Sequence, residues 1–300
     1  MKKGITITII ILVSVLLVGE AAFVICLWRA NWDFEELSNV DYIEESVSLS
    51  ADEVESITAE VGTKNIYYLT ADDDKITVTY FTIKNKKGEV ITEVVPTLTD
   101  GALLCKEEEK LPSVMLFDFH KDERLVIKVP AEKVLDVSLT VSTGNVTFGE
   151  EGKEQRAGSL KVKASTGNIT LIGKTTLSKE LSLEASTGNL KIEGDLDCAG
   201  DVSAKASTGK ISVSGRIKGD NINFETSTGK VKVTSPMAFN ALNVTTSTGD
   251  VSVVAAGSKE QYSYLHESST GDSNIPSYIA GDKRITIHTS TGDIELSFAE

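Results

Sequence analysis

Apolar and polar residues alternate in short segments through the second half of the chain, and the tripeptide Ser-Thr-Gly interrupts the alternation at regular intervals. In one segment Leu160, Val162 and Ala164 precede the tripeptide, and Ile169 and Leu171 follow it. An alternation with a period of two is typical of a β-strand with one buried face. The pattern therefore predicts a strand on each side of every Ser-Thr-Gly.

The tripeptide also marks a corner in the chain. The step from Ala164 to Ile169 is odd, so a straight strand would place these two side chains on opposite faces. A corner at Ser165-Thr166-Gly167-Asn168 keeps both side chains in one interior, and Gly167 tolerates a positive φ there. A second corner is expected at Gly173, Gly194, Gly215 and Pro236, each soon followed by an apolar residue: Leu177, Leu196, Ile217 and Met237. Each repeat is thus expected to form two strands and a short third.

The repeat recurs with a nearly constant period. The eight copies of Ser-Thr-Gly begin at Ser142, Ser165, Ser186, Ser207, Ser227, Ser247, Ser269 and Ser290, so neighbouring copies are 20 to 23 residues apart. Such a period is typical of a solenoid. We expect an all-β fold, a parallel β-solenoid (β-helix) with coils of about 21 residues stacked about 4.8 Å apart over residues 137–300.

Residues 54–136 carry a less regular β pattern that is expected to cap or begin the solenoid. Residues 57–69 resemble a worn repeat with Asn65 in the place of Asn168. Further strands are expected at residues 76–83, at 89–95, ending before Pro96, and at 102–105, whereas the charged run 106–110 is interpreted as a solvated turn or loop.

The carboxyl end of the sequence shows no comparable cap. Ile294, Leu296 and Phe298 complete the last coil, and the sequence ends at Glu300. An uncovered coil exposes the edges of its strands. We therefore expect an uncapped C-terminal coil that associates with a partner.

An apolar run near the amino end indicates a membrane segment. Residues 5–28 are long enough to cross a bilayer as one helix, and Lys2 and Lys3 before them place the amino terminus in the cytoplasm. Residues 1–30 are then a cytoplasmic tip and transmembrane anchor, residues 31–53 a juxtamembrane spacer, and the rest extracytoplasmic. A signal peptide cleaved near Gly19-Glu20-Ala21 is the alternative.

The net charge and the cysteines exclude two classes of protein. The formal charge is −14 in total, and residues 1–30 contribute +2, which leaves −16 for the remainder. A surface this acidic repels phosphate backbones, so nucleic acid is excluded as a partner. Three cysteines, with Cys26 in the apolar run, give no disulfide framework, and Cys105 and Cys198 are interpreted as unpaired thiols.

Taken together, these motifs resemble the bacterial putative-adhesin β-solenoid family, a domain family of unknown function. The resemblance rests on the eight strand, Ser-Thr-Gly, strand units, each followed by Asn, Asp or Lys, and on the opening formed by residues 71–78 and Val129-Pro130. It covers about residues 40–300. The resemblance implies a non-enzymatic, surface-exposed bacterial β-helix of the cell envelope.

The sequence offers no catalytic constellation. His120, His266 and His288 are widely separated and lack the spacing of metal ligands. An acid–base pair is also missing from the outward positions of the second strands, which carry Thr147, Thr170, Lys191, Ser212, Lys232 and Ser252. We therefore predict that the protein is not an enzyme and needs no cofactor; a carbohydrate-active β-helix enzyme is the least favoured alternative.

The residue after each repeat glycine forms a column in the stack. From the first coil to the last it reads Asn145, Asn168, Asn189, Lys210, Lys230, Asp250, Asp272 and Asp293. Like charges about 5 Å apart repel unless water or a cation lies between them. A calcium site at Asp250, Asp272 and Asp293 is therefore a hypothesis, with exposed turn residues as the alternative.

The seventh coil departs from the pattern. Its inward positions hold Tyr264 and His266, its turns hold Tyr262 and Tyr278, and Pro276 ends its second strand. Breaks in a consistent pattern often mark functional or strained sites, and clustered tyrosines suit contacts with proteins or sugars. These four residues are the candidate binding site, although a worn repeat packed by aromatic residues explains them too.

The sequence thus predicts a membrane-anchored, extracytoplasmic β-solenoid that acts as a binding, adhesin-like or scaffold module. Its expected partners are the membrane, through residues 5–28, and a component of the cell envelope or another protein. An envelope-stress sensor that contacts a membrane partner, with Glu20 in the apolar run as the contact, is the main alternative.

Overall fold

The computed structural model describes residues 19–20, 22–29, 32, 40–111, 123–274, 276–278 and 280–299. The chain divides into two compact units. The larger, called the solenoid unit below, comprises residues 44–81, 94–108 and 123–300, and the smaller comprises residues 1–43, 82–93 and 109–122.

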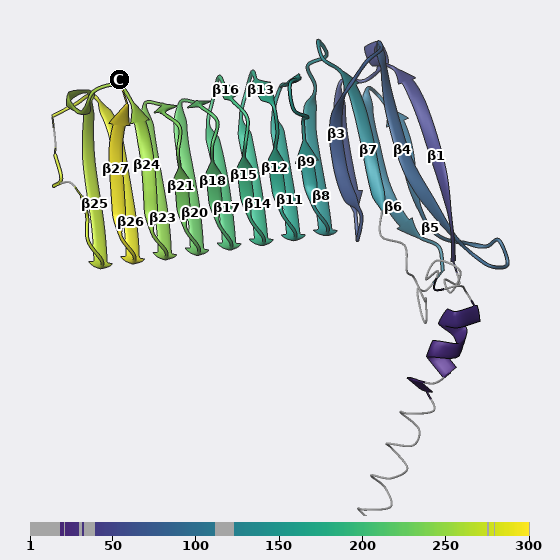
Figure 1. The fold of residues 1–300 in the computed structure, drawn as a ribbon. Coiled ribbons are helices and arrows are strands. Elements are labelled where there is room, and N and C mark those ends of the chain that lie inside the picture. Colours follow the sequence, from purple (N-terminus) through teal and green to yellow (C-terminus); the bar gives the residue numbers. More distant parts are fainter. Residues whose placement is uncertain are drawn as a thin grey trace, which may run out of the picture. The chain divides into compact units, whose positions relative to one another are not determined.

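The centre of the solenoid unit consists of coils of three strands, and each strand pairs in parallel with its equivalent in the next coil (Figure 1). The first strands are β8 (Asp136–Thr143), β11 (Leu160–Thr166), β14 (Leu181–Thr187), β17 (Val202–Thr208), β20 (Asn221–Thr228) and β23 (Ala241–Thr248). The second strands are β9 (Val146–Phe148), β12 (Ile169–Leu171), β15 (Leu190–Ile192), β18 (Ile211–Val213), β21 (Val231–Val233) and β24 (Val251–Ala256). The third strands are β10 (Glu154–Ala157), β13 (Lys174–Leu177), β16 (Leu196–Cys198), β19 (Ile217–Lys218) and β22 (Met237–Ala238). The predicted parallel solenoid is therefore confirmed.

The corner glycines are required because the turns stack closely. Gly167 has φ +145°, and a Cβ atom built on it would lie 1.8 Å from the carbonyl oxygen of Gly144 in the preceding coil. The same approach recurs at Gly188, Gly209 and Gly229. Any side chain would separate the turns, so the sequence holds glycine at this position in every regular coil.

The core changes its chemistry along the stack. Ala164, Ala185 and Ala206 occupy the last inward position of the first strand in the early coils. Threonine replaces alanine from β20 onward, and Thr226 and Thr246 are buried. Their hydroxyl groups donate to the carbonyl oxygens of the corner glycines one coil back, at 3.1 and 3.2 Å. These hydroxyls therefore satisfy buried carbonyl groups.

The third strands differ in register from the sequence-based alignment. Leu177 pairs with Cys198, whereas the residue that pairs with Leu196 is Thr175. Thr175 is buried in the core. Leu177 is therefore not the equivalent of Leu196: the spacing from the second strand is the same in both coils, and in the earlier coil a buried threonine occupies the first inward position.

The amino-terminal end of the stack does not follow chain order. Its elements are β1 (Val40–Ser50), η2 (Ala51–Glu53), β2 (Ser56–Val61), β3 (Asn65–Ala71), β4 (Lys75–Asn85), β5 (Val90–Thr99), β6 (Ala102–Glu109) and β7 (Arg124–Pro130). Strand β2 lies between β6 and β8, and β3 lies between β7 and β9. The layer of β6 and β7 is thus outside the earlier layer of β2 and β3, and β4 pairs antiparallel with β7.

Four expectations for this end can now be judged. The worn repeat at residues 57–69 is confirmed, since the backbone N–H of Asn145 donates to Asn65 Oδ1 at 2.8 Å. Strand β5 continues through Pro96 instead of ending before it. Residues 106–109 belong to strand β6 and are not a loop, and the residues assigned to the spacer include strand β1.

The carboxyl-terminal end shows the same inversion. Its elements are η3 (Lys259–Gln261), β25 (Tyr262–Thr270), β26 (Lys283–Thr291) and β27 (Ile294–Ala299). Strand β26 pairs with β23 on one side and with β25 on the other, and β27 pairs with β24 (Figure 1). The expectation of an uncapped last coil is therefore wrong: the last coil of the sequence is covered by the preceding one.

The described part of the smaller unit contains a helical segment and parts of strands β1, β4, β5 and β6. Val40, Ile83 and Ile91 are buried together there, with Tyr42 packed against them. Most of the expected membrane segment lies outside the described residues, and within the described part no helix is long and apolar enough to span a bilayer. The transmembrane anchor stays a prediction.

Candidate binding surfaces

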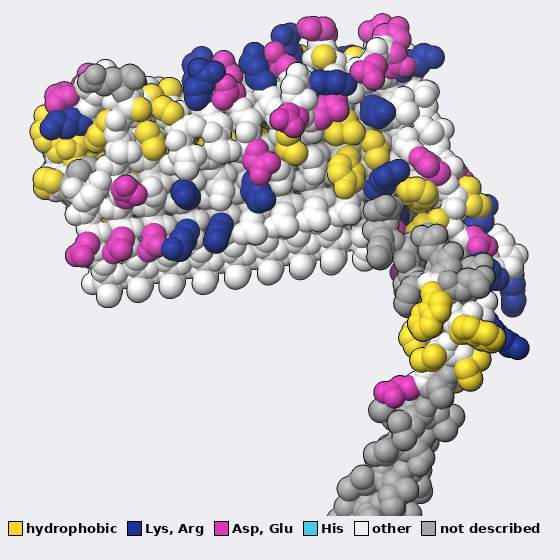
Figure 2. Space-filling view, in the orientation of Figure 1, with side chains coloured by type: hydrophobic (Ala, Val, Ile, Leu, Met, Phe, Trp, Pro, Cys, Tyr) yellow, Lys and Arg dark blue, Asp and Glu magenta, His cyan; other side chains and the backbone are white. Residues whose placement is uncertain are grey.

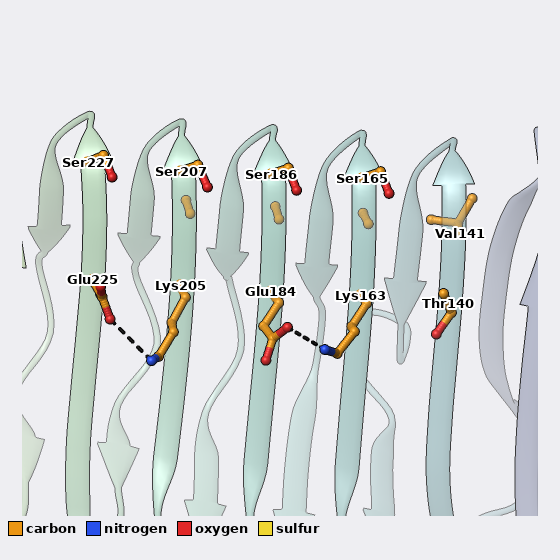
Figure 3. Close-up of a pocket in the computed structure, with 13 residues that line it drawn as sticks. Thr140, Val141, Lys163, Ser165, Glu184, Ser186, Lys205, Ser207, Glu225 and Ser227 are labelled. Carbon is orange, nitrogen blue, oxygen red and sulfur yellow. Dashed lines mark ion pairs between the residues drawn. The ribbon is translucent and has the colours of Figure 1, made fainter.

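A shallow open groove of about 520 Å³ runs across the outward face of the first strands from β8 to β20 (Figure 3). The period-two alternation that buries the apolar residues necessarily directs the intervening polar residues to this face. The corner serines form one row along the groove: Ser165, Ser186, Ser207 and Ser227. A second row holds alternating charges: Lys163, Glu184, Lys205 and Glu225.

The charged row is paired within itself. Lys163 Nζ lies 2.6 Å from Glu184 Oε2, and Lys205 Nζ lies 3.2 Å from Glu225 Oε2. All four side chains are 41–51% exposed. Ion pairs this accessible contribute only about 0–1 kcal/mol each, so an incoming polar ligand can exchange partners with them at small cost.

The corner column is a continuous hydrogen-bonded ladder. The amide oxygens of Asn65, Asn145, Asn168 and Asn189 each accept from the backbone N–H of the residue one coil farther along, at 2.8–3.0 Å. These asparagines therefore have a structural role, because they fix the turns against one another.

The aspartates continue this ladder in an order that the sequence does not show. From the centre outward it runs Asp250, Asp293, Asp272, and the backbone N–H of each outer residue donates to the carboxylate before it, at 3.2 and 2.9 Å. Along one edge of the stack, Figure 2 shows a run of acidic side chains next to basic ones. Lys230 Nζ, which donates to Asp250 Oδ2 at 2.6 Å, holds the pKa of Asp250 below its usual value.

Calcium at this column stays a prediction. Within the described residues no three His, Cys, Asp or Glu side chains are grouped closely enough to hold a metal ion. The backbone N–H groups and Lys230 also relieve part of the repulsion that suggested a cation.

Ion pairs join coils at the two other corners of the stack. Asp136 pairs with Lys179 at 2.7 Å beside the start of the first strands, and Asp195 pairs with Arg216 at 2.6 Å between the second and third strands. The side-chain hydrogen bonds from these basic groups hold the pKa values of both aspartates below their usual range. Each pair joins different coils, so both corners are stabilised electrostatically at neutral pH.

The tyrosines of the seventh coil form an aromatic cluster at the carboxyl-terminal end. Tyr262 is fully buried, its hydroxyl donates to the carbonyl oxygen of Ala256 at 2.5 Å, and its ring lies 5.6 Å from that of Phe298. Tyr264 is 7% exposed and stacks 5.5 Å from Tyr278, which is 40% exposed. Of the three predicted tyrosines, only Tyr278 offers a substantial surface to a ligand.

The histidines do not come together. His266 is partly buried beside this cluster, and its Nε2 atom has no hydrogen-bond partner. His288 lies 3.4 Å from Glu267 on the neighbouring strand, and His120 lies outside the described residues. The structure brings Tyr262, Tyr264 and Tyr278 together and places His266 on the same strand as the first two.

A buried ionic cluster at the amino-terminal end escaped the sequence analysis. Lys64 is fully buried and pairs with Glu107 and Glu123. The signal was present in the sequence, because Lys64 occupies the corner position that glycine holds in the regular coils. The cysteines are separate features: Cys105 and Cys198 are buried free thiols, and burial raises the pKa of Cys105 to about 12.

One protein-family model and several solved structures resemble this chain. The family model Toastrack DUF4097 matches residues 54–297. Among solved structures, a putative adhesin from Bacteroides fragilis is similar, with 13% identity, a TM-score of 0.46, and coverage of 86% of this chain and 97% of that one. A putative lipid binding protein from Parabacteroides distasonis has 16% identity, a TM-score of 0.48 and the same coverage. A putative cell adhesion protein from Clostridium sporogenes has 9% identity, a TM-score of 0.31, and coverage of 86% and 100%. No curated protein matches the chain.

Proposed function

Since the chain belongs to the Toastrack DUF4097 family, a domain family of unknown function, we propose that it acts without catalysis as an adhesin-like binding module of the bacterial cell envelope. In this proposal residues 5–28 anchor the chain in the membrane and the solenoid unit lies outside the cytoplasm. The groove across β8, β11, β14, β17 and β20 contacts the ligand.

The observation that carries the proposal is the repetition of the same side chains along the groove. Corner serines recur in each coil, one strand spacing apart, and exposed lysines and glutamates alternate beside them. Stacked strands are spaced about 4.8 Å apart, so the same side chains recur at that interval along the groove. A repetitive envelope polymer can therefore make the same weak contact in several coils, and such contacts multiply into useful avidity.

A pelleting experiment tests the proposal. The purified full chain, kept in mild detergent, is mixed with isolated bacterial cell wall and centrifuged, and the bound fraction is measured against protein concentration. We expect saturable pelleting that weakens at high salt, because the contacts include exposed charges. Absence of pelleting would remove the cell wall as the ligand and favour a scaffold that contacts a membrane partner.

Two double variants then locate the contact surface. Ser186→Trp with Ser207→Trp fills the groove with bulky side chains at exposed positions, and we expect binding to fall at least tenfold. Ser212→Trp with Thr170→Trp, on the outward face of the second strands β18 and β12, is the control and should bind as the native chain does. Equal loss in both variants would move the contact away from the groove.

A further inference from the structure

Lys64 stands apart from every other charged residue that the structure describes, because it alone is fully buried. It lies in the corner between β2 and β3, at the end of the glycine column. Its partners come from the layer of β6 and β7, which lies outside that of β2 and β3: Glu107 is on β6, and Glu123 is immediately before β7. Burying an ammonium group is costly unless its partners meet it closely.

The three side chains are arranged for a reaction as well as for an ion pair. Lys64 Nζ lies 2.5 Å from Glu107 Oε1 and 3.1 Å from Glu123 Oε2. The second oxygen of Glu107 accepts a hydrogen bond from the backbone N–H of Gly62. The two glutamate side chains are only 12% and 17% exposed, so little water reaches the cluster.

This geometry contains a nucleophile, an electrophile and a proton carrier. The Lys64 amine is next to the carboxyl carbon of Glu107, and Glu123 contacts the same amine from another side. One oxygen of each carboxylate lies within hydrogen-bond distance of the amine, so a proton can pass directly from the ammonium to either one. The N–H of Gly62 points at the oxygen that becomes negative when the carboxyl carbon is attacked.

We infer that Lys64 and Glu107 condense to an intramolecular amide bond. The Lys64 ammonium passes one proton to Oε1 of Glu107, and the neutral nitrogen attacks Cδ of the resulting carboxylic acid. Gly62 N–H stabilises the oxyanion of the tetrahedral intermediate. Glu123 then takes a second proton from the nitrogen and delivers it to the departing hydroxyl, so one water molecule leaves. The nitrogen loses two hydrogens in all and the carboxyl group one oxygen, so the reaction balances without an oxidant, a reductant or a nucleotide.

The amide would tie the β2–β3 corner to strand β6 across 43 residues of sequence. Strand β6 could then not separate from β2 without breaking a covalent bond. The edge of β2 is thereby protected permanently from pairing with a strand of another chain. This inference does not depend on the proposed binding function, because it concerns a covalent bond within the amino-terminal end and not a ligand at the groove.

Mass spectrometry of the purified full chain tests the amide. After digestion we expect one branched peptide that joins Lys64 to Glu107 and weighs one water molecule less than its two parts. The chain also supplies a matched control, because Lys163 and Glu184 are equally close at 2.6 Å but well exposed. No amide is expected between those two residues. Unmodified peptides at both Lys64 and Glu107 in the native chain would overturn the inference.

Two variants distinguish the roles of the side chains. Lys64→Arg keeps the positive charge but removes the amine, so the branched peptide should disappear. Glu123→Gln keeps the shape but cannot carry the proton, and we expect at least tenfold slower cross-linking in a time course of cell-free synthesis. An unchanged rate in this variant would overturn the role assigned to Glu123.

Discussion

The centre of the solenoid unit and its two ends are built by different means. In the centre, identical turns stack so closely that backbone geometry alone selects the residues, as at Gly167 and Gly188. At each end the chain order is inverted, and a particular set of side chains closes the stack: the Lys64 cluster at one end and the Tyr262 cluster at the other. Repetition therefore specifies the centre, whereas individual contacts specify the ends.

The largest effect should follow from breaking the central repetition. Gly188→Ala places a Cβ atom 1.8 Å from the carbonyl oxygen of Gly167 in the preceding coil. The two turns cannot move apart by themselves, because each is part of a stacked coil. We expect a loss of more than about 4 kcal/mol in the free energy of unfolding, measured by urea denaturation with circular dichroism.

Gly152→Ala is the control for that substitution. Gly152 also has a positive φ, at +77°, but no atom lies within 4 Å of the position of its Cβ. The cost should be about 1–2 kcal/mol, from backbone strain alone. Equal costs for both variants would show that strain, and not the stacking of turns, requires glycine in the centre.

Substitutions at the amino-terminal end should have the next largest effect on stability. Lys64→Met removes the amine, so that neither the ion pairs nor the amide can form and Glu107 and Glu123 stay largely buried without it; we expect a loss of about 3–5 kcal/mol in the free energy of unfolding. Lys163→Met breaks an exposed pair of the central coils and should cost at most about 1 kcal/mol. Thermal and urea unfolding of the two variants side by side measures the difference, and similar losses would contradict the role of burial.

The carboxyl-terminal end depends on packing more than on charge. Tyr262→Ala removes a fully buried ring that contacts Phe239 and Phe298, and we expect a loss of about 3–5 kcal/mol. Tyr262→Phe keeps the ring and loses only the hydrogen bond to Ala256, for about 1 kcal/mol. Tyr278→Ala, at a half-exposed site, should reduce the free energy of unfolding by less than either Tyr262 variant does. A larger loss for Tyr278→Ala would show that Tyr278, and not Tyr262, contributes most to the stability of this end.

The smallest expected effect on stability comes from the exposed ion pairs of the central coils. Asp136 and Asp195 have pKa values below their usual range, so between the folded and unfolded pKa values the unfolded chain binds more protons. Their stabilisation is present above about pH 4 and is lost as the pH falls through the folded pKa values. The melting temperature should therefore fall in acid, and Arg216→Gln should flatten this dependence. An unchanged profile in that variant would exclude the Asp195 pair as a contributor.

Much of the fold could be predicted from local pattern alone. The alternation around residues such as Val162 and Ile169, together with the recurring Ser-Thr-Gly, predicted the strands, the corner and the parallel stack. These features are encoded within one period of the repeat, so each coil can be recognised from its own residues. The candidate tyrosines Tyr262, Tyr264 and Tyr278 are close in sequence and meet at one end, whereas their role in binding stays a prediction.

By itself, the sequence determined the coil: its length, its inward residues and the glycine that its corner requires. Only the tertiary structure decided the order of the outermost coils. Residues 257–282 and 72–101 are long enough for the chain to pass over one layer and return, so chain order does not fix stacking order. The same long-range packing brings Glu107 and Glu123 to Lys64, and places Asp293 between Asp250 and Asp272. Contacts between residues far apart in the chain depend on which surfaces fit, and no local pattern records that choice.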